Sequence, residues 1–395
     1  MILAADVVEL RHLLHRYAER SGEEVRTAGL VKNLLANSRP DRLIEGLGGH
    51  GIIAEYRGLE EGASILLRAE LDALPIADPS TWDHASLAEG VGHKCGHDGH
   101  MTILLEIAGA LGRRRPRRGS VLLLFQPAEE TGEGARRVLD SPAFLDVKPS
   151  WVFALHNLPG VSFGRVVVRA GPFAMASRGL ALQLTGETAH AATPDDGRRP
   201  THALAELLEA LDDAPGSLAP GHPRRSTVVH ARLGESAAFG TSPGAATLHA
   251  TLRGHSSDDI DRMAERHMSR IQEIAARHGL DAVTTWHEDF PATWNDERAA
   301  QLIESAARAE GLDVVRPNEP FGWSEDFGHF TAATPGALFG LGAGTDCPPL
   351  HSPVYDFPDP LIRPAVRLLM RLADDAAGTS PRNPGAPCEA PPTSN

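Results

Sequence analysis

The fold is decided by three stretches of sequence, SILLRA at residues 64–69, MTILLEIAGAL at 101–111 and VLLLFQ at 121–126. The first and third are short, continuous apolar runs with the length of buried strands, whereas the second has the length of a helix. Another short apolar run, WVFAL at 151–155, is expected to be the next strand. This alternation of strand and helix predicts an α/β sheet with helices on its faces.

The pattern changes near residue 176. Between there and residue 290 we expect four strands and two helices, at 178–185, 200–211 (helix), 226–233, 246–253, 258–278 (helix) and 282–287. This order predicts a small α/β sandwich inserted as a second domain. The α/β pattern then returns, with a helix at 297–310, a strand at 337–341 and a helix at 361–376. We therefore expect a discontinuous first domain (1–175 and 291–377), an inserted domain (176–290) and a disordered tail (378–395) rich in Pro, Ser, Asn and Gly.

Length and charge limit the classes of partner. A chain of 395 residues is long enough for two domains, and its formal net charge of −14 disfavours nucleic acid and anionic membrane surfaces. Its three cysteines, Cys95, Cys347 and Cys388, are too few and too scattered for a disulfide framework. The sequence shows no signal peptide and no apolar run near the roughly 18 residues that span a bilayer. We expect a cytoplasmic protein.

Ligand-type side chains are densest in HKCGHDGH at residues 93–100, between a Gly-rich loop and an apolar helix. A thiolate and an imidazole two residues apart, at Cys95 and His97, can face one metal ion in an irregular loop but not on a regular helix. The alternative is a polar loop with a helix cap.

Adjacent carboxylates follow the strand at 121–126, in QPAEETG at residues 126–132. Two carboxylates at the carboxyl end of a buried strand repel each other unless a positive group holds them. Open α/β sheets bind their ligands at that end. One of Glu129 and Glu130 can bind a metal ion while the other acts as a general base. A solvated loop is the other interpretation.

Two further histidines are placed in the same way. His156 is expected directly after the strand at 151–155, and His351 lies in a Gly/Pro-rich loop after the strand at 337–341. A single histidine at a strand end is usually structural. Cysteine, histidine and glutamate side chains that converge from four separate loops instead favour a metal site.

Taken together, these motifs resemble the metal-dependent amidohydrolase and peptidase family of hippurate hydrolase, bacterial aminoacylases and plant auxin-conjugate hydrolases. The resemblance extends from about residue 6 to 376. It rests on RAELDALP (68–75), residues 93–98, residues 126–130, His156, SEDF (324–327) and HSP (351–353).

The resemblance implies a zinc-peptidase-like catalytic domain with a central mixed sheet, and a smaller lid domain through which the chain would form a homodimer. It implies that Glu129 is the catalytic acid/base and that the metal ligands are Cys95, His97, Glu130, His156 and His351. One or two divalent transition-metal ions, Zn, Mn, Co or Ni, suit this mixed set of sulfur, nitrogen and oxygen ligands.

Two lid residues are expected to meet the substrate. His190, in AHAATP at 189–194, resembles the family histidine that reaches the substrate carbonyl. Arg253 is a candidate to pair with a substrate carboxylate, with a salt bridge at the edge of the sheet as the alternative. The chain departs from the family at FGTSPG (239–244), where many relatives have an Asn that contacts the substrate. Asp72, in Glu70-Leu71-Asp72, is expected to support the site rather than bind metal.

The sequence therefore predicts a metal-dependent hydrolase that cleaves the amide bond of N-acyl amino acids or related small amides. A dipeptidase or carboxypeptidase on the same scaffold is the first alternative. A non-catalytic relative that acts as a binding module is the second, and the complete set of Glu129 and five ligand-type residues argues against it.

Overall fold

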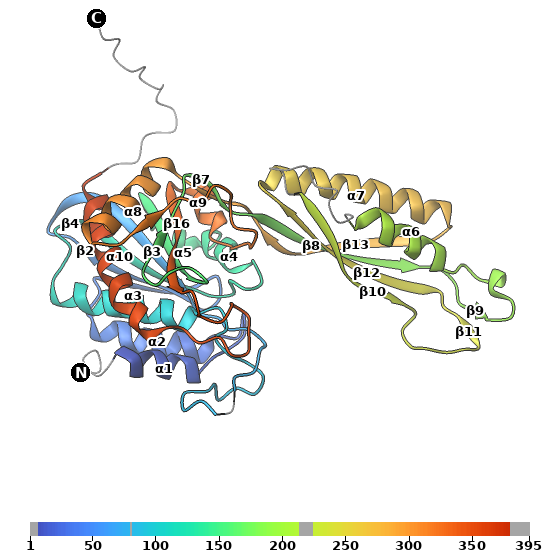
Figure 1. Cartoon of the computed structure of the whole chain (residues 1–395), viewed down its shortest axis with the longest axis horizontal. Coiled ribbons are helices and arrows are strands. Elements are labelled where there is room, and N and C mark those ends of the chain that lie inside the picture. The colour runs from blue at the N-terminus through green and yellow to red at the C-terminus, as the bar shows by residue number, and fades with distance from the viewer. Residues whose placement is uncertain (1–6, 80, 213–223, 380–395) are drawn as a thin grey trace, which may run out of the picture.

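The computed structural model describes residues 7–79, 81–212 and 224–379. It has two parts that follow one another along the long axis, a larger one around an eight-stranded sheet and a smaller one around a four-stranded sheet (Figure 1). This arrangement confirms the predicted fold class, α/β with a central mixed sheet and a smaller lid.

The larger sheet is mixed. Its strands, in spatial order, are β1 (Arg42–Leu47), β2 (Gly51–Arg57), β4 (Arg118–Gln126), β3 (Glu60–Glu70), β5 (Trp151–Pro159), β16 (Gly336–Gly344), β6 (Val166–Val167) and β15 (Val314–Val315). The central strands β4, β3, β5 and β16 run parallel to one another, whereas β1, β2 and β4 form antiparallel pairs. Because parallel strands bury both faces, they are the apolar runs that decide the fold.

Helices cover both faces of this sheet. The helices of the larger part are α1 (Val7–Arg16), α2 (Val25–Asn37), α3 (His97–Arg113), α4 (Gly134–Leu139), α5 (Pro142–Leu145), α8 (Glu297–Ala309), α9 (Gly328–Ala333) and α10 (Ile362–Ala377). One core joins α1, α2, α3, α8 and α10 to alternate residues of the strands, such as Leu67 and Leu123. The other core joins α4, α5 and α9 to the opposite residues, such as Leu66 and Leu124.

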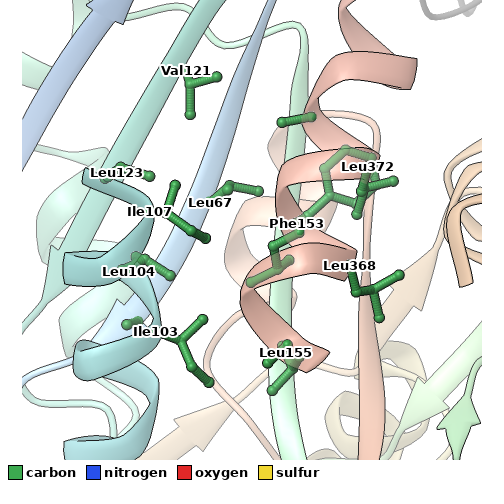
Figure 2. Packing of buried hydrophobic residues seen from close by; sticks show 14 of the residues in the cluster. Leu67, Ile103, Leu104, Ile107, Val121, Leu123, Phe153, Leu155, Leu368 and Leu372 are labelled. Atoms are coloured by element: carbon green, nitrogen blue, oxygen red, sulfur yellow. The ribbon is translucent and has the colours of Figure 1, made fainter. Parts of the chain in front are cut away.

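Figure 2 shows part of the first core, where α3 and α10 pack on the sheet. Ile103, Leu104 and Ile107 of α3 and Leu368 and Leu372 of α10 pack on the same face of the sheet, where the two helices lie next to each other. Their spacing of three and four residues is that of one helix face. The sheet is thereby fixed against two long helices, and the loops at its carboxyl edge project from a rigid base.

The smaller sheet is antiparallel, and its spatial order is β10 (Arg225–Leu233), β12 (Ala245–Gly254), β8 (Ala176–Thr185) and β13 (Asp281–Phe290). Its core joins the sheet to α6 (Thr201–Leu211) and α7 (Ser257–Arg277) on one face. The short strands β9 (Ala189–His190) and β11 (Thr241–Ser242) pair at the end of this part farthest from the larger sheet (Figure 1). A second short pair, β7 (Gly171–Ala174) and β14 (Thr293–Asn295), lies where the two parts meet.

Some expectations lie outside what the structure tests. The smaller sheet begins at Ala176 and ends at Phe290, but whether each part folds independently is a separate property, so the division into domains stays a prediction. Residues 380–395 of the expected tail, with Cys388, lie outside the described residues. Before them, the Trp151 indole N–H donates to the carbonyl of Thr379 at 3.1 Å. Among the described helices, none is both long and apolar enough to cross a membrane.

Candidate metal centre

The carboxyl ends of β3, β4 and β5 meet at one edge of the larger sheet, because the three strands run parallel. Glu129 and Glu130 follow β4 in the chain, and His97 begins α3. His156 lies inside β5 rather than after it, which corrects the sequence expectation. The strand continues past it because β16 pairs with β5 through Gly340 and His156 and beyond.

Cys95 and His97 face the same point as His156. The Cys95 Sγ lies 3.5 Å from the His156 Nε2, and the ligand atoms of all three residues lie within 4.8 Å of one another. Gly96, with φ of +95°, makes this possible by turning the chain into α3 in the left-handed conformation. A Cβ at Gly96 would also meet the Asn157 Oδ1 at 2.5 Å, so no larger residue fits there.

The paired glutamates come to the same place. The His97 Nε2 lies 3.9 Å from the Glu129 Oε2 and 3.8 Å from the Glu130 Oε1. The His351 Nε2 lies 3.8 Å from the other Glu130 oxygen. Separations of this size are typical of ligand atoms that share one ion. The structure therefore brings all five predicted ligands and Glu129 together.

Backbone strain marks two of the loops that build this cluster. Ala128, before the glutamate pair, has φ of +52°, and His351 has φ of +63°. Left-handed conformations cost residues with a side chain on the order of 1 kcal/mol and persist where their surroundings hold them. Here the Ala128 N–H donates to the Glu24 carboxylate and the His351 N–H donates to the Lys94 carbonyl, both at 2.8 Å.

Asp72 connects two arms of the cluster. The His97 Nδ1 donates to the Asp72 carbonyl at 2.9 Å, which directs the opposite ring nitrogen, Nε2, at the glutamates. The Asp72 carboxylate accepts from the Glu130 N–H at 3.0 Å and from the Ser21 hydroxyl at 2.7 Å. Second bonds of this kind fix the orientation of a metal-binding histidine.

A buried arginine, Arg68, binds three carboxylates next to the cluster. The Arg68 guanidinium donates to Glu70, to Glu325 at 2.8 Å, to Asp326 at 2.6 Å and to the Gln126 side chain at 2.9 Å. Sequence reasoning gave these residues no individual role, although two charges inside an otherwise apolar strand, Arg68 and Glu70, were a signal. The remaining partners lie up to 258 positions away in the chain, so only the fold reveals them.

His100 has a supporting place in the same way. Its Nδ1 lies 2.7 Å from the Glu70 Oε2, and its Nε2 accepts from the Asn157 N–H at 3.4 Å. Both ring nitrogens therefore have partners within the protein, and His100 braces the cluster beside His97.

The pKa values at this site are strongly shifted, first because the groups are buried and second because carboxylates outnumber cations around them. Burial, together with Glu325 and Glu130, raises the pKa of Glu129 well above its usual value. Burial raises the pKa of Glu130 to about 7 against the opposing effect of His97. Burial alone would lower the pKa of His97, but the surrounding carboxylates, Glu70 first, raise it to about 10. Such values are those of a site that lacks positive charge.

The residues present fit a divalent metal ion. Among the described buried side-chain atoms, the His97 Nε2 and a Glu130 oxygen have no hydrogen-bond partner, although both lie at the centre of the cluster. Buried polar atoms without partners are uncommon and require an explanation. A cation at this point would satisfy both atoms and offset the surplus of carboxylates. Sulfur, imidazole and carboxylate donors together suit borderline transition metals.

A family model described as "Peptidase family M20/M25/M40" matches residues 66–375. The chain belongs to this family. The match confirms the resemblance read from the sequence and the predicted class of enzyme, a hydrolase of the amidohydrolase and peptidase type.

Curated relatives in the M20 family include an N-acetyl-L-cysteine deacetylase of Bacillus subtilis (strain 168), which is 30% identical over 94% of this chain and 88% of its own length. An IAA-amino acid hydrolase (ILR1-like 2) of Arabidopsis thaliana is 30% identical over 88% of this chain and 80% of its own. A solved Bacillus subtilis structure described as a dinuclear metal binding peptidase from the M20 family has a TM-score of 0.78 at 25% identity, covering 94% of this chain and 97% of its own.

The predicted lid residue His190 lies far from the cluster. It is exposed in β9, at the far end of the lid (Figure 1). The segment that lacks the family Asn lies beside it, because His190 pairs with Thr241 and the Ala191 N–H donates to the Gly240 carbonyl at 3.0 Å.

Arg253 lies at the junction of the two parts. Its Nη1 donates to the Gly322 carbonyl at 3.0 Å and to the Ser324 hydroxyl at 3.1 Å. β12, which carries it, is an inner strand of the lid sheet, so the alternative of a salt bridge at the sheet edge does not describe these contacts. Ser324 directly precedes Glu325, and Arg253 is thereby tied to the segment that borders the cluster.

Proposed function

We propose that this protein is a metal-dependent amidohydrolase that cleaves the acyl–nitrogen bond of N-acyl amino acids or related small amides. The observation that carries the proposal is the convergence of Cys95, His97, Glu130, His156 and His351 on one point, with Glu129 beside them. The names of several curated relatives support the substrate class, since they are deacetylases of N-acetylated amino acids and hydrolases of an amino acid conjugate.

The proposed metal ligands are these five residues, and they hold one or two divalent ions. Two overlapping groups of ligand atoms support a pair, one of Cys95, His97 and His156 and the other of Cys95, Glu130 and His351. The solved relative described as a dinuclear metal binding peptidase supports the same number. Zn, Mn, Co and Ni all suit the donor set.

Glu129 is the proposed catalytic acid/base. When bound, the metal would lower the pKa of water and polarise the amide carbonyl. Glu129 lies 3.9 Å from the His97 ring and is buried, so its carboxylate is close to the ligands and shielded from bulk water. It takes a proton from the attacking water and delivers it to the leaving nitrogen. The Asp326 N–H, which donates to the Glu129 Oε1 at 3.4 Å, helps to hold that carboxylate in place.

Arg253 is the proposed partner of the substrate carboxylate. One nitrogen of its guanidinium is held by Gly322 and Ser324, which fixes the group without neutralising it. Both partners are neutral oxygens, so the guanidinium keeps its positive charge and can bind an anion. A planar guanidinium recognises a carboxylate with two parallel hydrogen bonds.

His190 is proposed to complete the site of a second subunit. Within one chain it is exposed and lies at the end of the lid that points away from the cluster (Figure 1). A homodimer through the lid would carry this end to the partner's cluster, where an imidazole can hold the developing oxyanion.

The test is a hydrolysis screen over N-acyl amino acids, with metal analysis of the same preparation. We expect turnover of several N-acetyl amino acids, its loss on dialysis against a chelator, and its return with Mn, Co or Zn. Free dipeptides are the comparison set, because a peptidase would prefer them. Full activity in a demonstrably metal-free sample would sink the proposal.

A further inference from the structure

Trp323 stands beside the proposed metal site, and the mechanism above gives it no role. Its ring centre lies 5.7 Å from that of His156, and its side chain is half-buried. A large aromatic side chain that remains partly open next to a reaction centre offers apolar surface that a ligand can cover.

The indole is fixed in position. The Met175 N–H lies 3.1 Å from the carbonyl oxygens of both Phe321 and Trp323, and the Phe321 N–H donates to the Phe173 carbonyl at 2.8 Å. The Trp323 ring stacks on Phe321 with ring centres 5.0 Å apart, and the edge of Phe173 closes a third side. The aromatic surface is therefore preorganised, so covering it with a ligand costs little ordering.

Arg253 shows which part of a substrate reaches this surface. Its guanidinium bonds to Gly322 and Ser324, the two chain neighbours of Trp323. If the substrate carboxylate pairs with Arg253 and the amide lies at Glu129, a single carbon, the amino acid Cα, separates these two groups. That carbon then lies over residues 322–324, and its side chain meets the indole.

We propose that Trp323 is a specificity-determining residue that contacts the amino acid side chain of the substrate and selects N-acyl amino acids with aromatic or large aliphatic side chains. This inference rests on the proposed function and narrows its substrate class. The competing role is purely structural, in which Trp323 and Phe321 only pack against the core of the larger part that contains Phe173.

The experiment compares kcat/KM for N-acetyl glycine, alanine, leucine and phenylalanine in the wild type, Trp323→Ala and Trp323→Phe, all loaded with metal. The ratio of phenylalanine to alanine substrate should fall roughly tenfold or more in Trp323→Ala, the size expected when a large apolar contact is lost. Trp323→Phe should keep most of the preference. Activity on N-acetylalanine should fall less than activity on N-acetylphenylalanine, and metal content should stay close to wild type.

Two controls separate this role from others. Trp286→Ala removes another partly exposed indole, which lies under the Arg178 guanidinium in the lid, and it should leave the ratio unchanged. A series of alanine substrates with acetyl, hexanoyl or benzoyl groups should respond equally to Trp323→Ala. A change confined to that acyl series would overturn the assignment, and so would an equal loss on all side chains with metal retained.

Failure of the proposed function gives a different result. If the wild type hydrolyses none of the series, the hydrolase proposal fails, and calorimetric binding of N-acetylphenylalanine and N-acetylalanine to Glu129→Gln protein decides the role of Trp323. Equal affinities there, or a preference that survives Trp323→Ala, would overturn the inference. Should Trp323→Ala not fold, Trp323→Leu takes its place in every arm.

Discussion

At the scale of single residues, the site depends on left-handed backbone conformations that turn side chains toward one point. Gly96 lets Cys95 and His97 share a focus although they are two residues apart, and the left-handed conformation of His351 directs its ring to Glu130. Cys95 is buried, and burial together with Glu130 raises the pKa of its thiol well above the usual value. A thiol in that environment is a poor nucleophile unless a cation stabilises its thiolate.

Cys95 is therefore predicted to bind metal and not to attack the substrate. A small thiol reagent should modify it several-fold more slowly in the metal-loaded protein than after chelation, as measured by mass spectrometry of the labelled peptide. Cys347, which is partly exposed and outside the cluster, is the internal control and should react at the same rate in both samples. Trapping an acyl-thioester on Cys95 would show that the chemistry is nucleophilic.

The sequence predicted the residues of the cluster better than the neighbouring residues that hold them in place. Cys95, His97 and the glutamate pair stand out because ligand-type residues crowd into short loops, and the structure brings them together with His156 and His351. Their roles as ligands stay a prediction. Glu325 and Asp326 stood out only as part of the family motif at 324–327, without a role, because their role depends on Arg68, which lies more than 250 positions away in the chain.

At the scale of elements, helix α1 holds the loop that carries Cys95 and His97, although it contributes no predicted ligand. Arg11, buried in α1, donates to Asp98 at 2.9 Å and also to Asp356 and Asp359. His15, one turn later, lies 2.8 Å from Asp98 and 3.0 Å from Asp78. Asp98 directly follows His97, so α1 fixes the first turn of α3. The pair of Arg11 and Asp98 is fully buried, and the loss of one partner would leave an uncompensated charge.

This network predicts a pH dependence of stability. Burial lowers the pKa of His15, but Asp78 and Asp98 raise it to about 9, above the roughly 6.5 of an unfolded histidine. Protonated His15 therefore stabilises the fold fully below about pH 6.5, and this contribution, on the order of a few kcal/mol, is lost as the pH rises through about 9. Urea unfolding from pH 6 to 10 should show a stability gap between wild type and His15→Gln that shrinks with rising pH.

His12→Gln on the same helix is the matched control. Burial and the neighbouring Arg11 lower the pKa of His12, so its ring is neutral throughout the alkaline range and its replacement should leave the alkaline slope unchanged. A gap between wild type and His15→Gln that stays constant to pH 10 would contradict the charged state assigned to His15.

Element prediction succeeded where the hydrophobic pattern was strong. The runs at 64–69, 121–126 and 151–155 became β3, β4 and β5, each longer than expected. The hairpin of β1 and β2 was not predicted, because β1 is an edge strand with only two buried residues and gives no clear alternation. Strands β6 and β15 have two residues each and exist only through their pairing.

At the scale of the whole molecule, the two predicted lid residues of the site lie at opposite ends of the lid. Arg253, in the lid sheet, donates to Ser324 of the larger part. His190 is exposed at the opposite end of the lid. The change in pattern near residue 176 predicted an inserted second domain, and the resemblance to the family implied that this domain is a lid. Neither could give the order of strands, in which β16 lies beside β5 although about 180 residues separate them, since pairing over such distances leaves no local signal.

A shared site predicts complementation between inactive variants. His190→Ala and Glu129→Ala, each inactive alone, should recover roughly one quarter of wild-type activity when they are co-refolded in equal amounts. Half of all the dimers formed are then heterodimers, and each heterodimer has one intact site of two. Subunit exchange is verified by native mass spectrometry with differently tagged chains. Absence of recovery despite proven exchange would show that His190 does not serve the partner.

The most direct test of the central claim compares Glu129→Gln with Glu130→Gln. Both carboxylates lie within 4 Å of the His97 Nε2, but only that of Glu130 also lies 3.8 Å from the His351 Nε2, so Glu130 is the neighbour placed between two proposed ligands. Glu129→Gln should keep its fold and metal content while kcat falls by about two to four orders of magnitude, the usual contribution of a positioned general base. Glu130→Gln should lose metal together with activity. Loss of metal in Glu129→Gln with retention in Glu130→Gln would reverse the two roles, and normal turnover by Glu129→Gln would contradict the mechanism.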